Sequence, residues 1–190
     1  MKIKKELKRF WEFLKEDSWQ STFVSLIIFL ILIYFVIMPF FSWVFGTKYF
    51  LVIVESCSMH HSKELGEILD NNIYKEYGIF KENSTNWKLK NGFTKGDIIF
   101  SVAPKNLSVG DVIIFNAGEK YKYPIIHRII YLDKEKIITK GDNNDGILDV
   151  EKNILIEQVR AKSLFRIPYL GWIKLVFFDW RNHPEKRGLC

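Results

Sequence analysis

The 190-residue chain has few cysteines and, over one long stretch, no charged side chain. Its 2 cysteines are too few for a scaffold held by several disulfides or for a four-cysteine zinc site. Residues 18–47 contain no Asp, Glu, Lys or Arg, although charged residues make up 26% of the chain. Aromatic residues make up 16%, which excludes a disordered protein that cannot bury apolar surface. The composition therefore predicts a globular domain attached to an apolar anchor.

The apolar segment 23–44 has the length of one transmembrane helix. As an α-helix it would span about 33 Å, close to the roughly 30 Å of a hydrocarbon core. Trp19, Trp43 and Tyr49 flank the segment at the expected level of the lipid headgroups. A cleaved secretory signal has a shorter apolar region of about 7–15 residues, followed by a small-residue cleavage site. We predict a single-pass anchor over residues 20–46.

Basic residues are concentrated before the anchor, which predicts its orientation. Only Lys48 and Lys63 stand in the comparable stretch after it. Because basic flanks remain cytoplasmic, the tail 1–19 is expected in the cytoplasm, as an amphipathic helix on the lipid bilayer. The rest of the chain is then expected on the side away from the cytoplasm, at either a cell membrane or an endoplasmic-reticulum membrane. The basic residues before the anchor are Lys2, Lys4, Lys5, Lys8, Arg9 and Lys15. No dense basic run occurs elsewhere, so no nucleic-acid partner is predicted.

Residues 47–180 alternate β-type runs with turn residues and predict a mostly β domain with antiparallel strands. The polar segment 62–94 is expected to be an inserted lobe or loop, and residues 181–190 a C-terminal tail. The runs are rich in Ile, Val, Phe and Tyr. The expected strands are 49–55, 97–103, 111–116, 125–132, 137–139, 155–167 and 169–178.

A serine, a histidine and a group of carboxylates are the candidates for chemistry. Ser58 follows the first expected strand, where a serine is commonly a turn residue. His127 lies among isoleucines in a strand and is interpreted either as a hydrogen-bonded core histidine or as a general base. Asp142, Asp145 and Asp149 follow, and one of them could accept a hydrogen bond from the imidazole. They could also form Asx turns.

Metal binding is not predicted. With Gly146 as the sixth position of a calcium loop, the first and twelfth positions would be Gly141 and Lys152, which excludes that loop. His60 and His61 lack a third ligand at a suitable spacing. We therefore expect neither a metal site nor a cofactor.

Several segments in their order along the chain resemble type I signal peptidases. They are Ser-Met at 58–59, GDIIF, VGDVIIF, IIHRII, TKGDNN and IPYLGWI, spread over about residues 20–178. The resemblance is to the archaeal and endoplasmic-reticulum branch, which has a histidine where the bacterial branch has a catalytic lysine. It implies an antiparallel β domain of signal-peptidase type on a single N-terminal transmembrane helix. It also implies that the substrates are preproteins carrying signal peptides, with accessory or secretion-machinery subunits as further partners.

The same resemblance assigns roles to residues of this chain. Ser58 matches the nucleophile and His127 the general base, while Asp142 matches an aspartate that is important for activity. Asp149 is the expected triad acid, with Asp145 close enough to compete. The backbone N–H of Ser58 and the hydroxyl of Ser56 are the expected donors to an oxyanion.

The nucleophile segment also departs from the family pattern, which leaves other functions open. The family has Ser-Gly-Ser-Met-x-Pro, whereas this chain has SCSMHH at 56–61, so both Gly and Pro are replaced. This change alters backbone freedom beside the nucleophile. Because a thiol is a strong nucleophile, a sortase-like transpeptidase using Cys57, His127 and Arg128 is an alternative. A non-catalytic, membrane-tethered β subunit of a peptidase complex is another.

Overall fold

A computed structural model describes residues 2–118, 121, 123–176 and 190 of the chain. The chain divides into two compact units, Met1–Val44 and Phe45–Cys190, and each is described by itself.

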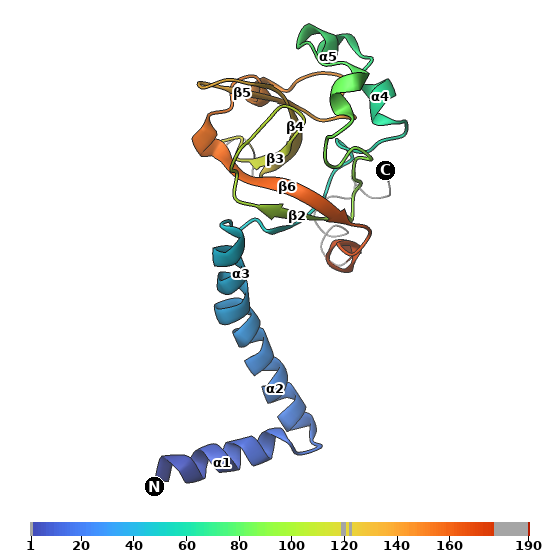
Figure 1. Cartoon of the computed structure of the whole chain (residues 1–190). Helices are drawn as coiled ribbons and strands as arrows, with labels where there is room; N and C mark the ends of the chain where they lie inside the picture. The colour runs from blue at the N-terminus through green and yellow to red at the C-terminus, as the bar shows by residue number, and fades with distance from the viewer. Residues whose placement is uncertain (1, 119–120, 122, 177–189) are drawn as a thin grey trace. The chain divides into compact units, whose positions relative to one another are not determined.

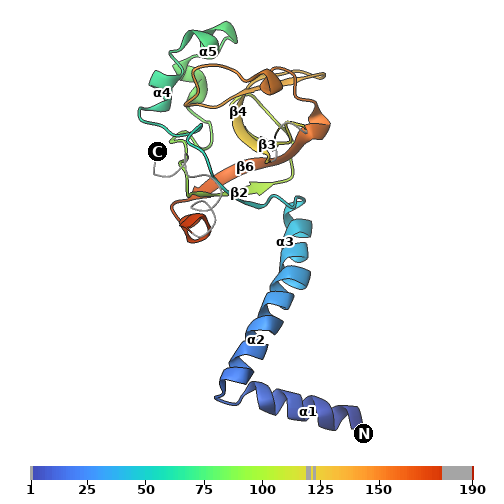
Figure 2. The same ribbon diagram turned by 180° about the vertical axis from the view of Figure 1, so that it is seen from behind.

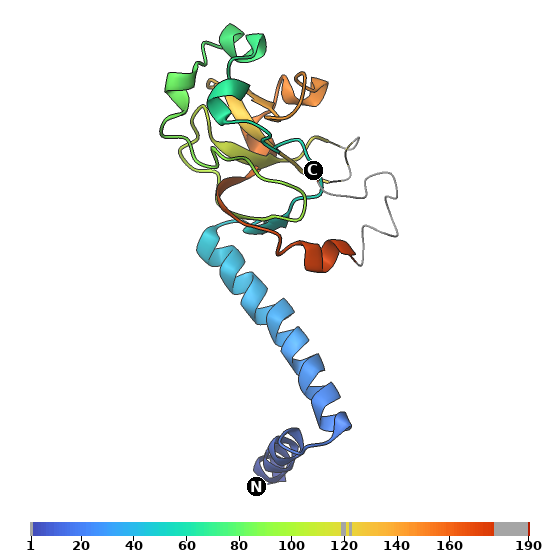
Figure 3. The same ribbon diagram turned by 90° about the vertical axis from the view of Figure 1, so that its right-hand side faces the viewer.

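The N-terminal unit is helical. Helix α1 (Lys2–Leu14) carries apolar side chains that are exposed, among them Ile3, Leu7 and Trp11. The chain then turns, and α2 (Trp19–Leu32) begins where the Ser18 side chain accepts a hydrogen bond from the Ser21 N–H. Figure 3 shows α1 as a helix separate from the long one that follows it. The long helix continues through η1 (Ile33–Ile37) into α3 (Met38–Phe45).

The long helix contains a π turn, which the sequence pattern did not predict. At the end of η1 the Met38 N–H donates to the Ile33 carbonyl, five residues back. Pro39 follows directly; it has no N–H and its ring crowds the carbonyl four residues earlier, so a widened turn before it relieves the conflict. Residues Trp19–Phe45 form a continuous apolar helix of 27 residues, in which a window of 18 residues has a mean hydropathy of 2.9. By length and composition it could cross a membrane, which confirms the expected anchor as a helix.

The second unit is built on one sheet of six strands, and every pairing in it is antiparallel. The strands are β1 (Leu51–Ile53), β2 (Ile98–Val102), β3 (Val112–Phe115), β4 (Ile125–Leu132), β5 (Ile137–Lys140) and β6 (Val159–Ile167). Their order in the sheet is β1-β2-β6-β3-β4-β5, so β1 lies at an edge. This confirms the predicted mostly β, antiparallel fold.

The sheet buries apolar side chains on both faces. Strands β3 and β4 therefore read as continuous Ile-rich runs instead of alternating ones. One core cluster includes Ile113, Phe115 and Ile129. A second joins Met59, just before the segment 62–94, and Phe93, near the end of that segment, to the sheet. The sheet thus supports the segment that follows β1.

The segment 62–94 folds as a lobe with its own short helices. These are α4 (Leu65–Ile68), α5 (Asn72–Glu76) and the 3₁₀ turn η2 (Lys81–Ser84). Figures 1 and 2 show α4 and α5 together, at the opposite end of the unit from β2. Tyr74 of α5 is fully buried and shares a core cluster with Ile130 of β4 and Ile138 of β5. The lobe therefore packs on the sheet and is not a free loop.

The prediction of a strand over residues 169–178 is wrong for residues 169–176, the part of it that the structure describes. Residues 168–171 form a turn and residues 172–176 are helical. Tyr169 has a φ of 60°, which ends the extended backbone of β6, and the Gly171 N–H then donates to the Gly96 carbonyl at 2.8 Å. A Cβ on Gly171 would lie 2.8 Å from that carbonyl oxygen, so only glycine permits the approach. Residues 177–189, including most of the expected C-terminal tail, lie outside the described residues.

Candidate active site

Ser58 is the second residue of a tight turn after β1. The turn is closed by the His60 N–H, which donates to the Cys57 carbonyl at 3.0 Å. Met59 is buried with 1% of its surface exposed, and its carbonyl accepts from the Phe93 N–H at 2.9 Å. The Ser58 hydroxyl lies 3.2 Å from the Ser56 hydroxyl. The turn is therefore anchored by the residues around Ser58.

His127 is buried in β4, and its ring contacts a buried carboxylate. Its Nδ1 is hydrogen-bonded to Oε1 of Glu151, which also accepts from the Thr139 hydroxyl at 2.8 Å. The other oxygen of Glu151 accepts from the Leu148 N–H at 3.0 Å. A carboxylate that receives these donors also accepts from Nδ1, which places the ring proton there and leaves Nε2 as the basic nitrogen.

The expected acid Asp149 does not lie beside His127; Glu151 takes that place, and this corrects the sequence-based placement. Both residues belong to the short 3₁₀ turn η3 (Asp149–Glu151). A 3₁₀ turn rotates by about 120° per residue, so its first and third side chains point in different directions. The Asp149 side chain is 95% exposed and pairs with Lys152 at 2.8 Å, and Asp145 is also exposed. The sequence did not predict Glu151, because the resemblance implies an aspartate as the triad acid.

Asp142 is buried in a different polar cluster. Its carboxylate accepts from the Arg128 guanidinium, with Nη2 at 2.7 Å, from His61 Nε2 at 2.8 Å and from the Tyr74 hydroxyl at 3.3 Å. Burial by itself raises the pKa of Asp142, but the Arg128 charge and the hydrogen bond from His61 outweigh it and hold that pKa well below its usual range. Burial and the Asp142 charge also raise the pKa of Tyr74, so its hydroxyl stays protonated.

Arg128 connects this cluster to the inserted lobe. Its Nη1 donates to the carbonyls of Lys88 and Gly110, and its Nη2 to the carbonyl of Leu89. Adjacent residues on a strand point to opposite faces, so Arg128 binds Asp142 while His127 binds Glu151. The two neighbours in sequence thus belong to two separate polar clusters.

The loop after β5 approaches both the imidazole and the nucleophile turn. A Cβ on Gly141 would lie 2.8 Å from His127 Nε2, so the backbone passes directly beside the basic nitrogen. Two residues later, Asn143 donates from its backbone N–H to the Ser58 carbonyl at 2.8 Å. It also donates from its side-chain amide to the Cys57 carbonyl at 3.0 Å.

Ser58 and His127 line the same groove, which has a volume of 590 Å³. Its walls are largely apolar and include the whole of the edge strand β1. The other lining residues include Ser56, Phe93, Tyr121, Tyr123, Asn144 and Leu148. The Ser58 hydroxyl, the His127 imidazole and the apolar edge strand β1 therefore line one groove.

Cys57 is joined to Cys190 by a disulfide. A disulfide sulfur is not a free thiol, so the hypothesis of a Cys57 nucleophile is wrong for this structure. The partner roles that the hypothesis gave to His127 and Arg128 also fail, because the two side chains bind different carboxylates.

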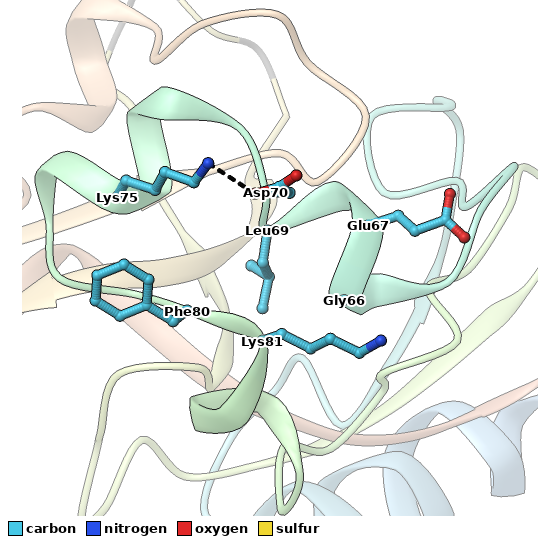
Figure 4. Close-up of a pocket in the computed structure, with 7 residues that line it drawn as sticks. All are labelled: Gly66, Glu67, Leu69, Asp70, Lys75, Phe80 and Lys81. Atoms are coloured by element: carbon cyan, nitrogen blue, oxygen red, sulfur yellow. Dashed lines mark ion pairs between the residues drawn. The ribbon is translucent and has the colours of Figure 1, made fainter.

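A smaller pocket lies inside the inserted lobe. Figure 4 shows Leu69 and Phe80 among its lining residues, and the ion pair of Asp70 with Lys75 at 2.7 Å beside them. Its volume is 250 Å³, and it contains neither Ser58 nor His127. In the part of the chain that the structure describes, no group of three His, Cys, Asp or Glu side chains could hold a metal ion.

Comparison with known proteins supports the resemblance seen in the sequence. The chain is similar to the signal peptidase complex catalytic subunit SEC11 of Saccharomyces cerevisiae strains YJM789, RM11-1a and JAY291. Each comparison gives 36% identity over 97 residues, covering 44% of this chain and 56% of the relative. The chain thus spans about half the length of these curated relatives. No family model matches it.

Proposed function

We propose, from the similarity to signal peptidase catalytic subunits, that the chain is a membrane-anchored serine endopeptidase that removes signal peptides from preproteins. The observation that carries the proposal is the groove lined by both Ser58 and His127, with Glu151 buried behind the imidazole. A hydroxyl, a basic ring nitrogen and an orienting carboxylate are the groups that acyl transfer from a peptide bond needs.

In the first half of the reaction, His127 Nε2 takes the proton of the Ser58 hydroxyl as Oγ attacks the scissile carbonyl carbon. The C–N bond then breaks, and the imidazolium gives its proton to the leaving amine. The result is an acyl-enzyme on Ser58 and a released mature chain. Water repeats the sequence with His127 as base, and hydrolysis of the ester frees Ser58 and the signal peptide.

Glu151 orients the base. Its carboxylate accepts a hydrogen bond from Nδ1–H, so Nε2 is left to accept the proton of Ser58. The negative charge of the carboxylate also stabilises the imidazolium that forms when Ser58 is deprotonated. The Thr139 hydroxyl and the Leu148 N–H also donate to this carboxylate, so its orientation is set before substrate arrives. Asp142 acts differently, by holding the loop after β5 through Arg128.

Developing negative charge on the substrate oxygen requires donors in the groove. The backbone N–H of Ser58 is one candidate, and the Ser56 hydroxyl, 3.2 Å from the Ser58 hydroxyl, is the other. Among the strands that the structure describes, β1 pairs only with β2, and it lines the groove, so an extended peptide could lie along its other side. We further propose that the substrates are membrane-inserted signal segments and that the tail 1–19 lies in the cytoplasm. Accessory subunits are the proposed partners.

The test is cleavage of a preprotein by the full chain in detergent micelles or liposomes. We expect release of the signal peptide by the wild type, measured by gel shift and by mass spectrometry of the new N-terminus. Ser58→Ala and His127→Ala should lose this activity, because each removes a reacting group, whereas Ser108→Ala, outside the groove, should retain it. A folded wild type that cleaves nothing would instead favour a non-catalytic subunit, and cleavage by Ser58→Ala would refute the assignment of the nucleophile.

A further inference from the structure

Asn143 is hydrogen-bonded to the peptide planes on both sides of Ser58, and the His60 N–H also donates to the first of them. Its side-chain amide donates to the Cys57 carbonyl at 3.0 Å, and its backbone N–H donates to the Ser58 carbonyl at 2.8 Å. The carbonyl of Cys57 and the N–H of Ser58 belong to the same planar peptide unit and point in opposite directions. Fixing that carbonyl therefore fixes the direction of the Ser58 N–H.

Several hydrogen bonds fix the backbone on both sides of Asn143. The turn that contains it is closed by the Asn144 N–H, which donates to the Gly141 carbonyl at 2.9 Å. The buried ammonium of Lys140 donates to the carbonyls of Gly141 at 3.0 Å and Asn144 at 2.6 Å. Between these points the Asp142 side chain is held by Arg128 and the Asp142 N–H donates to Met59 Sδ at 3.3 Å. The donors of Asn143 are thus aimed before any substrate binds.

The same turn also touches the base. A Cβ on Gly141 would meet His127 Nε2 at 2.8 Å, so the backbone that carries Asn143 passes beside the nitrogen that accepts the proton. One short loop therefore lies beside His127 Nε2 and is hydrogen-bonded to the carbonyl groups of Cys57 and Ser58. A shift of this loop would move the nucleophile turn relative to the imidazole.

We propose that Asn143 is a positioning residue that aims the Ser58 N–H at the developing oxyanion and sets the Ser58 hydroxyl against His127. It acts through two carbonyl groups of the chain and not on the substrate. This inference rests on the proposed peptidase function and deepens it, since it identifies a residue that holds the nucleophile turn.

The experiment compares Asn143→Ala and Asn143→Asp with the wild type in the full chain, with Asn72→Ala as a matched control on the exposed surface of α5. Aspartate keeps the shape and the backbone N–H of Asn143, but a carboxylate does not donate to the Cys57 carbonyl. We expect both variants to lower kcat for preprotein cleavage by about 10- to 100-fold, with KM and the thermal midpoint little changed. Labelling of Ser58 by a fluorophosphonate probe should slow with kcat.

Wild-type kcat in both variants would overturn the inference, as would a fall in kcat that only follows a loss of folded protein. The aspartate variant keeps the test valid if the alanine variant folds poorly. Failure of the inference is distinct from failure of the proposed function. In the first case the wild type cleaves through Ser58 and the Asn143 variants cleave equally well; in the second the wild type does not cleave.

Discussion

Asp142 and Glu151 are two of the buried carboxylates of the β domain, and they have different partners. Asp142 faces the guanidinium of Arg128, which is always charged, together with His61 and Tyr74. Glu151 faces an imidazole, a hydroxyl and a backbone N–H. Both carboxylates therefore contact an imidazole, but Asp142 also pairs with a permanent charge, the guanidinium of Arg128. We therefore expect Asp142 to hold the structure together and Glu151 to respond when His127 gains a proton.

The largest expected effect comes from removing the charge of Glu151. Glu151→Gln keeps the size of the side chain but allows the imidazole to adopt the wrong tautomer, and we expect kcat to fall by about 10⁴-fold. The measurement is steady-state preprotein cleavage together with circular dichroism to verify folding. Asp149→Asn is the matched control, because its exposed carboxylate lies away from the ring. Loss of activity in Asp149→Asn with retention in Glu151→Gln would reverse the comparison.

The second effect is on stability. Asp142→Asn leaves the buried Arg128 charge without its counter-ion, and breaking such a pair costs about 3–5 kcal/mol of unfolding free energy. Thermal or denaturant unfolding of the protein in detergent measures this loss, and activity should fall only as the folded fraction falls. Wild-type stability in Asp142→Asn would contradict the assigned role.

The pH dependence follows from the same pair. Because the pKa of Asp142 is lower in the folded chain than its ordinary value of 3.8, the unfolded chain binds its proton first as the pH falls. The stabilising contribution is therefore fully present above that value and is lost as the pH drops toward the folded pKa. The wild type should lose stability over this acid range, and Asp142→Asn should lose less. Equal slopes for both proteins would contradict the assignment.

The smallest of these effects concerns the loop that touches both polar clusters. A methyl group in Gly141→Ala would push against His127 Nε2 at 2.8 Å and against the Asn144 amide at 2.7 Å. We expect kcat to fall by about 10²-fold, because a displacement of about 1 Å at the reacting groups is sufficient for that. Gly146→Ala, whose Cβ would meet nothing within 4 Å, is the control. Equal kinetics in the two variants would show that the loop tolerates movement.

Much of the fold follows from local pattern. The uncharged run predicts the helix, and the Ile-rich runs predict the strands. The length of an apolar run and the β propensity of a segment both depend only on residues that are neighbours in the sequence. The segment 169–178 has the same apolar composition but turns after Pro168, since the Gly171 backbone bonds to Gly96, far away in sequence. Its composition therefore does not reveal its structure.

Residue type and spacing within short segments are enough to predict the apolar helix, the antiparallel strands and the candidacy of Ser58 and His127. Three contacts could not be predicted in this way: Glu151 and not Asp149 meets the imidazole, Cys57 is bonded to Cys190, and Asn143 is hydrogen-bonded to the nucleophile turn. Each of these contacts joins segments that are distant in the chain. Their side-chain directions depend on turns and packing that no local periodicity encodes.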